Sequence, residues 1–389
     1  MNILLLCHEY PPGSNGRGVH TDELARGLLA RGHSVAVLAA ATHELRNADL
    51  PPWVHPVMEP ESNRITDFES YRQPYTQNIY DLAARLHAER PFDLVHTHDW
   101  YSAEAGIRLT QDWDVPSVAT IHLFPKPIDI WQPRLCDASD VVIAVSHSIR
   151  HEALTKYQLA PGKVKMVYNA VDPARLTTVA TRDALLQQPA YQFLADPSLK
   201  LVLLSGRIHP QKGIDMLLQS IPEVLQHIDR VHWVVCGGGG IAEQVLPRYA
   251  PLIDRYEHAI TFTGHVPRHQ ALGWKRLADV VVAPSRYEAF GLSVLEAMLL
   301  GKAVIVADVD GLSELVVAGE SGLKLPLDQA TPDGDAVSPS ALAQAQIRLL
   351  QDETLAQRLG HTAQQYANLS FSYPRFIEQT LEVYQSVRA

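Results

Sequence analysis

The chain has 389 residues, of which 46% are hydrophobic and 20% charged, so it is long enough for more than one globular domain. Its formal net charge of −10 argues against nucleic acid as the main partner, because phosphate backbones select basic surfaces. The three cysteines are widely spaced without a CxxC motif, which favours buried thiols in a reducing compartment. With no signal-peptide pattern and no apolar stretch of membrane-spanning length, we expect a cytoplasmic protein without a transmembrane segment.

The first part of the chain alternates short apolar strands with helical segments. Strands are predicted at residues 2–7, 34–39, 93–96, 117–121, 141–145 and 164–168, and helices at residues 21–31 and 75–89. A proline-rich, irregular stretch occupies residues 50–63. Continuous apolar strands separated by helices predict a parallel sheet that is covered on both faces.

The same alternation restarts after a weaker stretch. Strands are predicted at residues 201–204, 232–236, 260–262, 279–283 and 303–307, and helices at residues 213–224, 292–300 and 366–388. We therefore predict an α/β protein with two Rossmann-like, doubly wound parallel-sheet domains. The predicted parts are a first domain (1–172), a linker (173–198), a second domain (199–365) and a C-terminal helix (366–389). Since binding loops leave the carboxyl ends of parallel strands, both domains are expected to present them to a shared crevice.

The strongest local pattern is VVVAPSRYEAFGLSVLEAMLLGKAVIVAD at residues 280–308. A strand leads into a loop with Glu288, and Gly291 opens a helix that carries Glu296. The free amides of a helix N-terminus attract anionic or hydroxyl-rich ligands. Two carboxylates around such a helix start suit a ribose and a hexose joined by a diphosphate. A solvent-facing pair of glutamates is the simpler alternative.

A second pattern, LLSGRIHPQKG at residues 203–213, places Arg207 and Lys212 between a strand and a helix. The rigid guanidinium fork and the ammonium point charge together suit a diphosphate. The alternative is a solvated basic loop.

Glycines follow two of the predicted strands, at residues 2–7 and 232–236. In the first loop Gly16 and Gly18 allow close approach of the backbone to a ligand, and Thr21 is expected to cap the following helix. The glycine run at residues 237–240 is as consistent with a tight turn as with ligand contact. Neither loop has the spacing of a dinucleotide fingerprint, which argues against a Rossmann dehydrogenase.

Histidines stand at predicted strand ends, at His96, His98 and His122. This edge of an open α/β sheet carries its ligand site. Two histidines at i and i+2 need further ligands to close a metal site, and none follows at a recognisable spacing. Three Asp-x-Asp triplets, including Asp308–Asp310, are more simply surface loops than metal ligands. We therefore expect no metal and no cofactor.

In this order the motifs resemble a large family of retaining glycosyltransferases that includes bacterial glycogen and sucrose synthases and phosphatidylinositol mannosyltransferases. The resemblance is most specific in GRIHPQKG, EAFGLSVLEAMLLGKAVIVAD, SELV and GESGL, while EYPP, GRGVH, HTHDWY and VATIH are similar to synthase-type members. It implies the GT-B fold, with the two domains facing a central cleft. The second domain is then expected to bind the donor and the first the acceptor, with the terminal helix crossing back to the first.

The resemblance also implies roles for individual residues. The catalytic group is expected to be His122, Glu288, Arg207 and Lys212. The donor is expected to contact Gly16, Arg207, Lys212, Val266, Glu288, Phe290, Gly291, Leu292 and Glu296. His98, Asp99 and Trp100 are expected on the acceptor side. Departures from the family pattern are Asn15, Ala170 and Asp310, each at a position where glycine is usual.

The reaction implied is transfer of a hexose from a nucleotide sugar, UDP-sugar by default, to an acceptor hydroxyl with retained configuration and without a metal. The partners are then the donor and a small-molecule or saccharide acceptor. Two alternatives remain open: a nucleotide-sugar epimerase of the same architecture, and a catalytically silent protein that binds nucleotide sugars.

Overall fold

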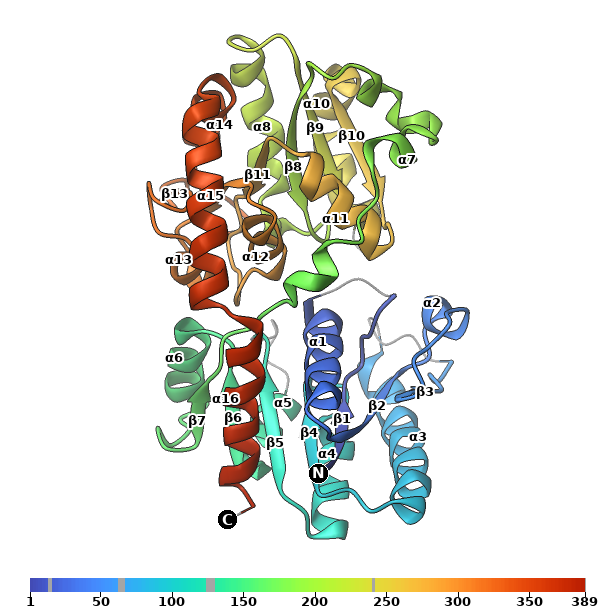
Figure 1. Cartoon of the computed structure of the whole chain (residues 1–389). Helices are drawn as coiled ribbons and strands as arrows, with labels where there is room; N and C mark the ends of the chain where they lie inside the picture. The colour runs from blue at the N-terminus through green and yellow to red at the C-terminus, as the bar shows by residue number, and fades with distance from the viewer. Residues whose placement is uncertain (13–15, 62–66, 124–129, 240–241, 389) are drawn as a thin grey trace. The chain divides into compact units, whose positions relative to one another are not determined.

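The computed structural model describes residues 1–12, 16–61, 67–123, 130–239 and 242–388. It divides into two compact units, one made of Met1–Ala170 with Tyr373–Ala389 and the other of Val171–Ser372 (Figure 1). Each unit is built around its own parallel sheet. All three cysteines are free and buried, as the sequence predicts.

The first unit contains a seven-stranded sheet in which every pair of neighbours is parallel. In sheet order its strands are β3 (Val54–Val57), β2 (Ser34–Ala40), β1 (Asn2–Leu6), β4 (Leu94–Thr97), β5 (Ser117–Ile121), β6 (Val141–Ala144) and β7 (Val164–Met166). Along β1, Ile3 and Leu5 enter one apolar core while Leu4 and Leu6 enter another. Because successive side chains of a strand point to opposite faces, this alternation shows that both faces of the sheet are covered.

Strand β3 is absent from the predicted strands. It lies at the edge of the sheet and contains Pro56. A proline has no amide to give to a ladder, so an edge strand tolerates it while the local sequence looks irregular.

Helices pack on both faces of the first sheet. They are α1 (Gly16–Ala30), α2 (His43–Arg46), α3 (Phe68–Glu89), α4 (Ala103–Trp113), α5 (Trp131–Ala138), α6 (His147–Lys156) and α16 (Tyr373–Ser386). Leu24 and Leu28 of α1 contribute to one core, and Tyr75 and Ile79 of α3 to the other.

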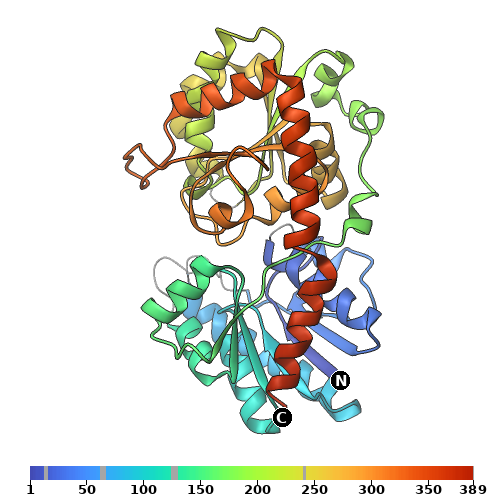
Figure 2. The same cartoon turned by 60° about the vertical axis from the view of Figure 1, so that its left-hand side comes forward.

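The C-terminal helix α16 belongs to the first unit, where it packs on α1 (Figure 2). The Tyr373 hydroxyl donates to the carbonyl oxygen of Glu23 at 2.7 Å. A Cβ at Gly27 would lie 2.2 Å from Cδ1 of Ile377, so only glycine admits this helix so closely. The single helix predicted from residue 366 is thus two helices, because α15 (Glu353–Ser370) ends in the second unit before α16 begins.

The second unit contains a six-stranded sheet in which neighbouring strands are again parallel. In sheet order its strands are β10 (Ile260–Gly264), β9 (Val231–Cys236), β8 (Lys200–Ser205), β11 (Val280–Ala283), β12 (Ala303–Ala307) and β13 (Leu323–Leu325). Its longer helices are α8 (Ile214–Leu225), α11 (Arg268–Leu277), α12 (Leu292–Leu299), α14 (Pro339–Gln351) and α15, and its shorter ones α7 (Arg182–Leu186), α9 (Ala242–Val245), α10 (Ala250–Arg255) and α13 (Asp310–Leu315). No helix in the described parts of the chain is both long enough and apolar enough to cross a membrane.

The stretch expected to be a linker packs on the second unit. The amide of Ala180 donates to the carbonyl oxygen of His269 in α11 at 3.0 Å. A Cβ at Gly273 would lie 2.6 Å from the Ala180 carbonyl oxygen, so α11 and this stretch are in backbone contact. Residues 173–198 are therefore part of the second unit's structure.

Strand order reverses at one point in each sheet. In the first sheet β1 lies between β2 and β4, and in the second β8 lies between β9 and β11. The crevice at the carboxyl ends of two strands whose connections leave in opposite directions is where open α/β sheets bind ligands. The loops after β1 and β4, and after β8 and β11, are therefore the places to look for function.

Candidate active site

The loops after β8 and β11 bring a cation and an acid together at the switch point of the second sheet. Lys212 ends a 3-10 turn, η3 (Pro210–Lys212), and Glu288 lies between β11 and α12. The Lys212 ammonium forms an ion pair with the Glu288 carboxylate. Their side chains are 21% and 20% exposed, so a ligand can reach both groups.

Two glycines fix the backbone around this pair. Gly213 has φ +65°, and a Cβ there would lie 1.9 Å from the carbonyl oxygen of Pro284, so the two loops are in backbone contact. Gly291 has φ +102° and precedes α12. Positive φ favours glycine, and the first amides of the helix that follows have no partner within the helix. The α12 N-terminus is thus an anion-attracting group in the loop that carries Glu288.

Arg286 connects the loop after β8 to the loop after β11 by hydrogen bonds. The sequence analysis did not identify this residue. Its guanidinium donates to both carboxylate oxygens of Asp215, at 2.8 and 2.5 Å, and to the Pro210 carbonyl oxygen at 2.8 Å. Its amide donates to the carbonyl oxygen of Gln211 at 2.8 Å. Arg286 therefore holds the turn that carries Lys212 against the loop that carries Glu288.

Asp310 accounts for one departure from the family pattern. Its φ is +41°, a left-handed conformation that aspartate tolerates better than most residues. Its carboxylate accepts a hydrogen bond from the amide of Glu288 at 3.3 Å, and the next amide, of Gly311, donates to the Glu288 carbonyl oxygen at 3.0 Å. Asp310 thus has a left-handed backbone at the position where the resemblance implies a glycine, and it holds the Glu288 loop.

Glu296 is buried in α12 between two cations. Its carboxylate accepts from Arg268 at 2.8 Å and lies 3.1 Å from the ammonium of Lys275, which also donates to the Ser205 hydroxyl at the end of β8. Burial raises the pKa of Glu296, but Lys275 and Arg268 together bring this pKa below its usual value. The carboxylate is therefore ionised at neutral pH and held at the carboxyl edge of the sheet.

The other residues expected at the donor differ in how they are placed. The Arg207 side chain is exposed and has no ion pair with any described residue. Val266 and Phe290 are buried, Phe290 with its ring 5.7 Å from that of Phe371. The Val266 and Phe290 side chains belong to the core, and Leu292 is half-buried.

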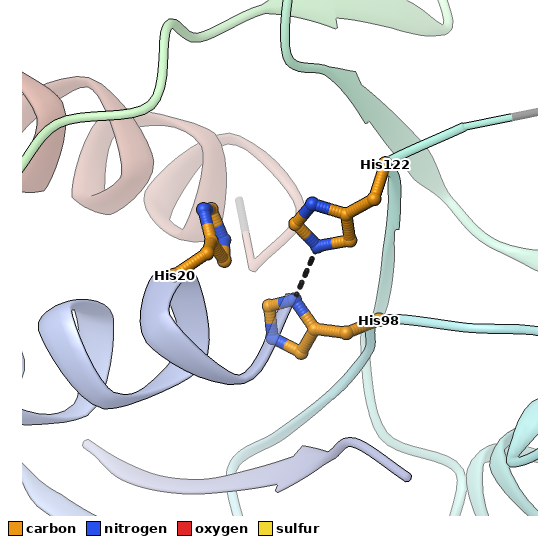
Figure 3. A group of neighbouring side chains, drawn as sticks. All are labelled: His20, His98 and His122. Carbon is orange, nitrogen blue, oxygen red and sulfur yellow. Dashed lines mark hydrogen bonds between the residues drawn. The ribbon is translucent and has the colours of Figure 1, made fainter. Parts of the chain in front are cut away.

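In the first unit, three histidine rings from separate elements meet. His20 comes from α1, His98 follows β4 and His122 follows β5, and Figure 3 shows their rings pointing toward one another. Nδ1 of His98 lies 3.4 Å from Nε2 of His122, and the His20 ring centroid is 4.5 Å from that of His122. Burial lowers the pKa of His20 to about 4 and the pKa values of His98 and His122 well below the usual range, so the rings are neutral at pH 7.

The sequence analysis did not single out His20. This residue matters for the expectation of no metal site, because it adds a third histidine to His98 and His122. The expectation considered His96 and His98, two residues apart. In the structure both ring nitrogens of His96 are used, by Tyr384 and Thr120 at 2.7 Å each, and His20 joins the cluster in its place. The signals in the sequence are the place of His20 at the end of the GRGVH motif and its position after the first-strand loop.

Asp99 and Trp100, expected on the acceptor side, shape the loop after β4. The Asp99 carboxylate accepts from the amide of His8 at 2.6 Å and from the amide and hydroxyl of Ser102 at 3.0 and 3.1 Å. The Arg17 guanidinium lies 4.8 Å from the centre of the Trp100 ring. Asp99 therefore joins the β1 and β4 loops, and Trp100 is the more accessible of the two.

The expectation that Thr21 caps the first helix is wrong. Helix α1 begins at the exposed Gly16, so Thr21 lies inside it and donates its hydroxyl proton to the carbonyl oxygen of Arg17 at 3.0 Å. Gly18 also has a packing role, because a Cβ there would lie 2.8 Å from the Glu9 carbonyl oxygen. Asn15 lies outside the described residues.

Two family models match the two halves of the chain. Residues 14–175 match the description "Glycosyltransferase Family 4", and residues 200–352 match "Glycosyl transferases group 1". The chain belongs to this glycosyltransferase family. A curated relative, glycogen synthase of Mycobacterium tuberculosis, is 26% identical over 429 aligned positions that cover 100% of this chain and 95% of the relative.

Solved structures of similar proteins show that this glycosyltransferase has the GT-B fold. Sucrose-phosphate synthase from Thermosynechococcus elongatus superimposes with a TM-score of 0.79 at 22% identity, covering 99% of this chain and 98% of that one. Anabaena Alr3699/HepE, in complex with UDP and glucose, superimposes with a TM-score of 0.79 at 20% identity, covering 99% and 100%. The predicted family and the predicted pair of Rossmann-like domains are confirmed.

Proposed function

We propose that this glycosyltransferase moves a hexose from a nucleotide sugar, UDP-sugar first, to an acceptor hydroxyl with retained configuration and without a metal. The observation that carries the proposal is the contact between Lys212 and Glu288 beside the α12 N-terminus, at the switch point of the second sheet. A cation, an acid and free amides at one place match a diphosphate joined to a sugar.

The diphosphate is assigned to Arg207, Lys212 and the amides at Gly291 and Leu292. Arg207 is exposed and unpaired among the described residues, which leaves its guanidinium available to an anion. Lys212 has only Glu288 as its ion-pair partner in the described parts, and a diphosphate offers it a stronger one. As the sugar–phosphate bond loosens, these fixed positive groups stabilise the charge that develops on the leaving group.

The ribose is assigned to Glu296. An ionised carboxylate accepts hydrogen bonds from two hydroxyls, and the Lys275 and Arg268 side chains keep Glu296 ionised in a buried position. Lys275 is 3% exposed and Arg268 21% exposed, so Arg268 is the partner that a ribose displaces.

The transferred sugar is assigned to Glu288 and His122. In the second unit Glu288 is assigned to the sugar hydroxyls. In the first unit the resemblance assigns His122 to the anomeric carbon, where a neutral ring or its carbonyl oxygen would stabilise the oxocarbenium-like sugar. The acceptor hydroxyl attacks from the face that the phosphate leaves, and a phosphate oxygen takes its proton, so the configuration is retained. His98, Asp99 and Trp100 line the acceptor side.

The order of donor candidates follows family frequency, with UDP-sugars first and ADP- and GDP-sugars behind. The complex of the Anabaena protein with UDP and glucose supports UDP. The complex of starch synthase IV from Arabidopsis thaliana with ADP and acarbose supports ADP-sugars as a further donor candidate.

The test has two steps. A thermal-shift screen with UDP, ADP, GDP and their sugars identifies the donor, because a ligand that binds only the folded state raises its melting temperature. The donor found is then incubated with a panel of acceptors in chelator, and the product anomer is read by NMR. Release of nucleotide with an α-linked product from an α-linked donor supports the proposal. An epimerised donor without acceptor, or binding without turnover across the panel, supports the epimerase or the silent binding protein instead.

A further inference from the structure

The cluster of His20, His98 and His122 has unused hydrogen-bonding capacity. Nε2 of His20 and Nε2 of His98 are fully buried and have no hydrogen-bond partner among the described residues. His20 is 2% exposed and His98 1% exposed, so bulk water does not serve these atoms. Buried polar atoms are almost always paired, and one that is not points to an ion, a ligand or a catalytic task. In this cluster the atom that points to an ion is Nε2 of His20, because His98 faces His122 with its other nitrogen, Nδ1. The neighbouring His96, with both nitrogens bonded, is the contrasting case of a satisfied core histidine.

The geometry of the cluster suits a metal ion better than a hydrogen-bonded network. Zinc–nitrogen bonds of about 2.0–2.1 Å place two imidazole nitrogens of a tetrahedral site about 3.4 Å apart. Nδ1 of His98 and Nε2 of His122 are 3.4 Å apart, which is long for a hydrogen bond. One nitrogen from each of the three rings lies within 4.8 Å of the others, so an ion that draws these nitrogens together has three imidazole ligands.

The surroundings of His20 match those of a metal ligand. Its Nδ1 donates to the side-chain oxygen of Asn169 at 2.8 Å, which leaves the lone pair of the neutral ring on Nε2. A metal-bound histidine commonly donates its other ring proton to an oxygen in this way, which fixes its tautomer and orientation. The positive charge of Arg17 lowers the pKa of His122. Arg17 also forms an ion pair with Glu9, whose negative charge offsets that of the guanidinium.

We propose that His20, His98 and His122 form a site for one transition-metal ion of the zinc type, and that filling it blocks sugar transfer. Three imidazoles suit Zn²⁺, Ni²⁺ or Cu²⁺, and water takes the fourth position of a tetrahedral ion. The inhibitory part rests on the proposed function, because a metal-bound His122 is no longer available to the sugar. The metal site itself rests only on the three rings.

Direct binding tests the site without an activity assay. The full chain is stripped with a chelator, and Zn²⁺ is titrated against a chromophoric competitor. The wild type is expected to bind one ion, and His20→Gln and His98→Gln are each expected to weaken binding by at least about tenfold. His151→Ala, which removes an exposed histidine of the same unit, is the control and keeps wild-type affinity. Equal binding by the wild type and both glutamine variants, with circular dichroism showing them folded, overturns the proposal.

Cobalt distinguishes the histidines from the buried cysteines. Co²⁺ in the wild-type site is expected to give the visible bands of a four-coordinate ion without a thiolate charge-transfer band in the near ultraviolet. A thiolate band, or a spectrum unchanged in His20→Gln, overturns the histidine assignment.

Transfer assays then test the inhibition. Zn²⁺ at saturation is expected to lower the wild-type rate at least about tenfold, with recovery on chelation, while His20→Gln stays active in Zn²⁺. Zn²⁺ binding that leaves the rate unchanged overturns the inhibition and removes the His122 ring from the reaction centre, while the metal site stands on its own titration. Absence of any transfer, with one Zn²⁺ bound, counts against the proposed function alone.

Discussion

Arg286 and Asp215 form a two-point ion pair inside the second unit, with nitrogen–oxygen distances of 2.8 and 2.5 Å. The pair joins the loop after β11 to the first turn of α8, on either side of the turn that ends at Lys212. The residues that we assign to the donor therefore depend on a contact between two residues to which we assign no ligand.

Removing Arg286 is expected to destabilise the protein. In Arg286→Ala the Asp215 carboxylate stays buried without its cation, and breaking such a pair costs about 3–5 kcal/mol of the free energy of unfolding. Chemical denaturation followed by fluorescence measures the loss. Arg248→Ala, which breaks an exposed pair with Asp333, is the control and is expected to change little. If the two variants unfold at the same denaturant concentration, the proposed role of Arg286 is wrong.

Removing the Lys212 charge is expected to affect turnover rather than folding. Losing one preorganised group that stabilises developing charge lowers kcat by about 10²–10³-fold. Lys212→Ala should show this loss with a melting temperature near that of the wild type, and Lys212→Arg should retain more activity. Lys200→Ala removes a cation of the same unit outside the site and serves as the control. Wild-type transfer by Lys212→Ala would remove this residue from the diphosphate site.

Two variants of Asp310 distinguish the cost of its left-handed backbone from the contribution of its hydrogen bond to Glu288. Asp310→Gly relaxes the backbone but loses the hydrogen bond to the Glu288 amide, whereas Asp310→Ala loses the bond and keeps the strain. We expect Asp310→Ala to be less stable than Asp310→Gly by about 1 kcal/mol. Equal unfolding free energies for the two variants would show that the φ of this residue carries no cost.

The ion pairs of Glu296 predict a pH dependence of stability. The pKa of Glu296 is lowered from its unfolded value of 4.5, so above pH 4.5 the carboxylate is ionised in both states and the pairs stabilise the folded state fully. Below 4.5 the unfolded chain takes up the proton first, and this stabilisation is lost as the pH falls through the folded pKa. Denaturation of the wild type and Glu296→Gln from about pH 7 to about pH 3.5 should show their difference constant at first and then shrinking in acid. A difference that grows in acid would contradict the assigned direction.

Much of the fold was predictable because its signals are local. Continuous apolar strands such as β1 and β8 identify a parallel sheet without any knowledge of the partner strand. The Glu288–Glu296 spacing and the Arg207–Lys212 loop were visible for the same reason, since each lies within one strand-to-helix connection. The edge strand β3 and the start of α1 at Gly16 were missed because proline and glycine obscure the local pattern there.

The partners of the site residues were not predictable in this way. Arg286 and Asp215 are 71 positions apart in the chain, and His20 and Asn169 are 149 apart. Arg286 lies within the 280–308 pattern, but its local sequence does not show that it pairs with Asp215 rather than facing solvent. Its partners follow from the order of the strands, which brings the β8 and β11 loops together.

The sequence by itself determined the family, the two sheets and the loops that carry the residues we assign to the donor, because strand and helix periodicity and short motifs are properties of neighbouring residues. Only the tertiary structure decided that Glu296 is held by Lys275 and Arg268, that Asp310 supports the Glu288 loop, and that His20 completes a cluster with His98 and His122. These groups meet because parallel strands from distant parts of the chain end at one edge of a sheet, so strand order decides which side chains become neighbours.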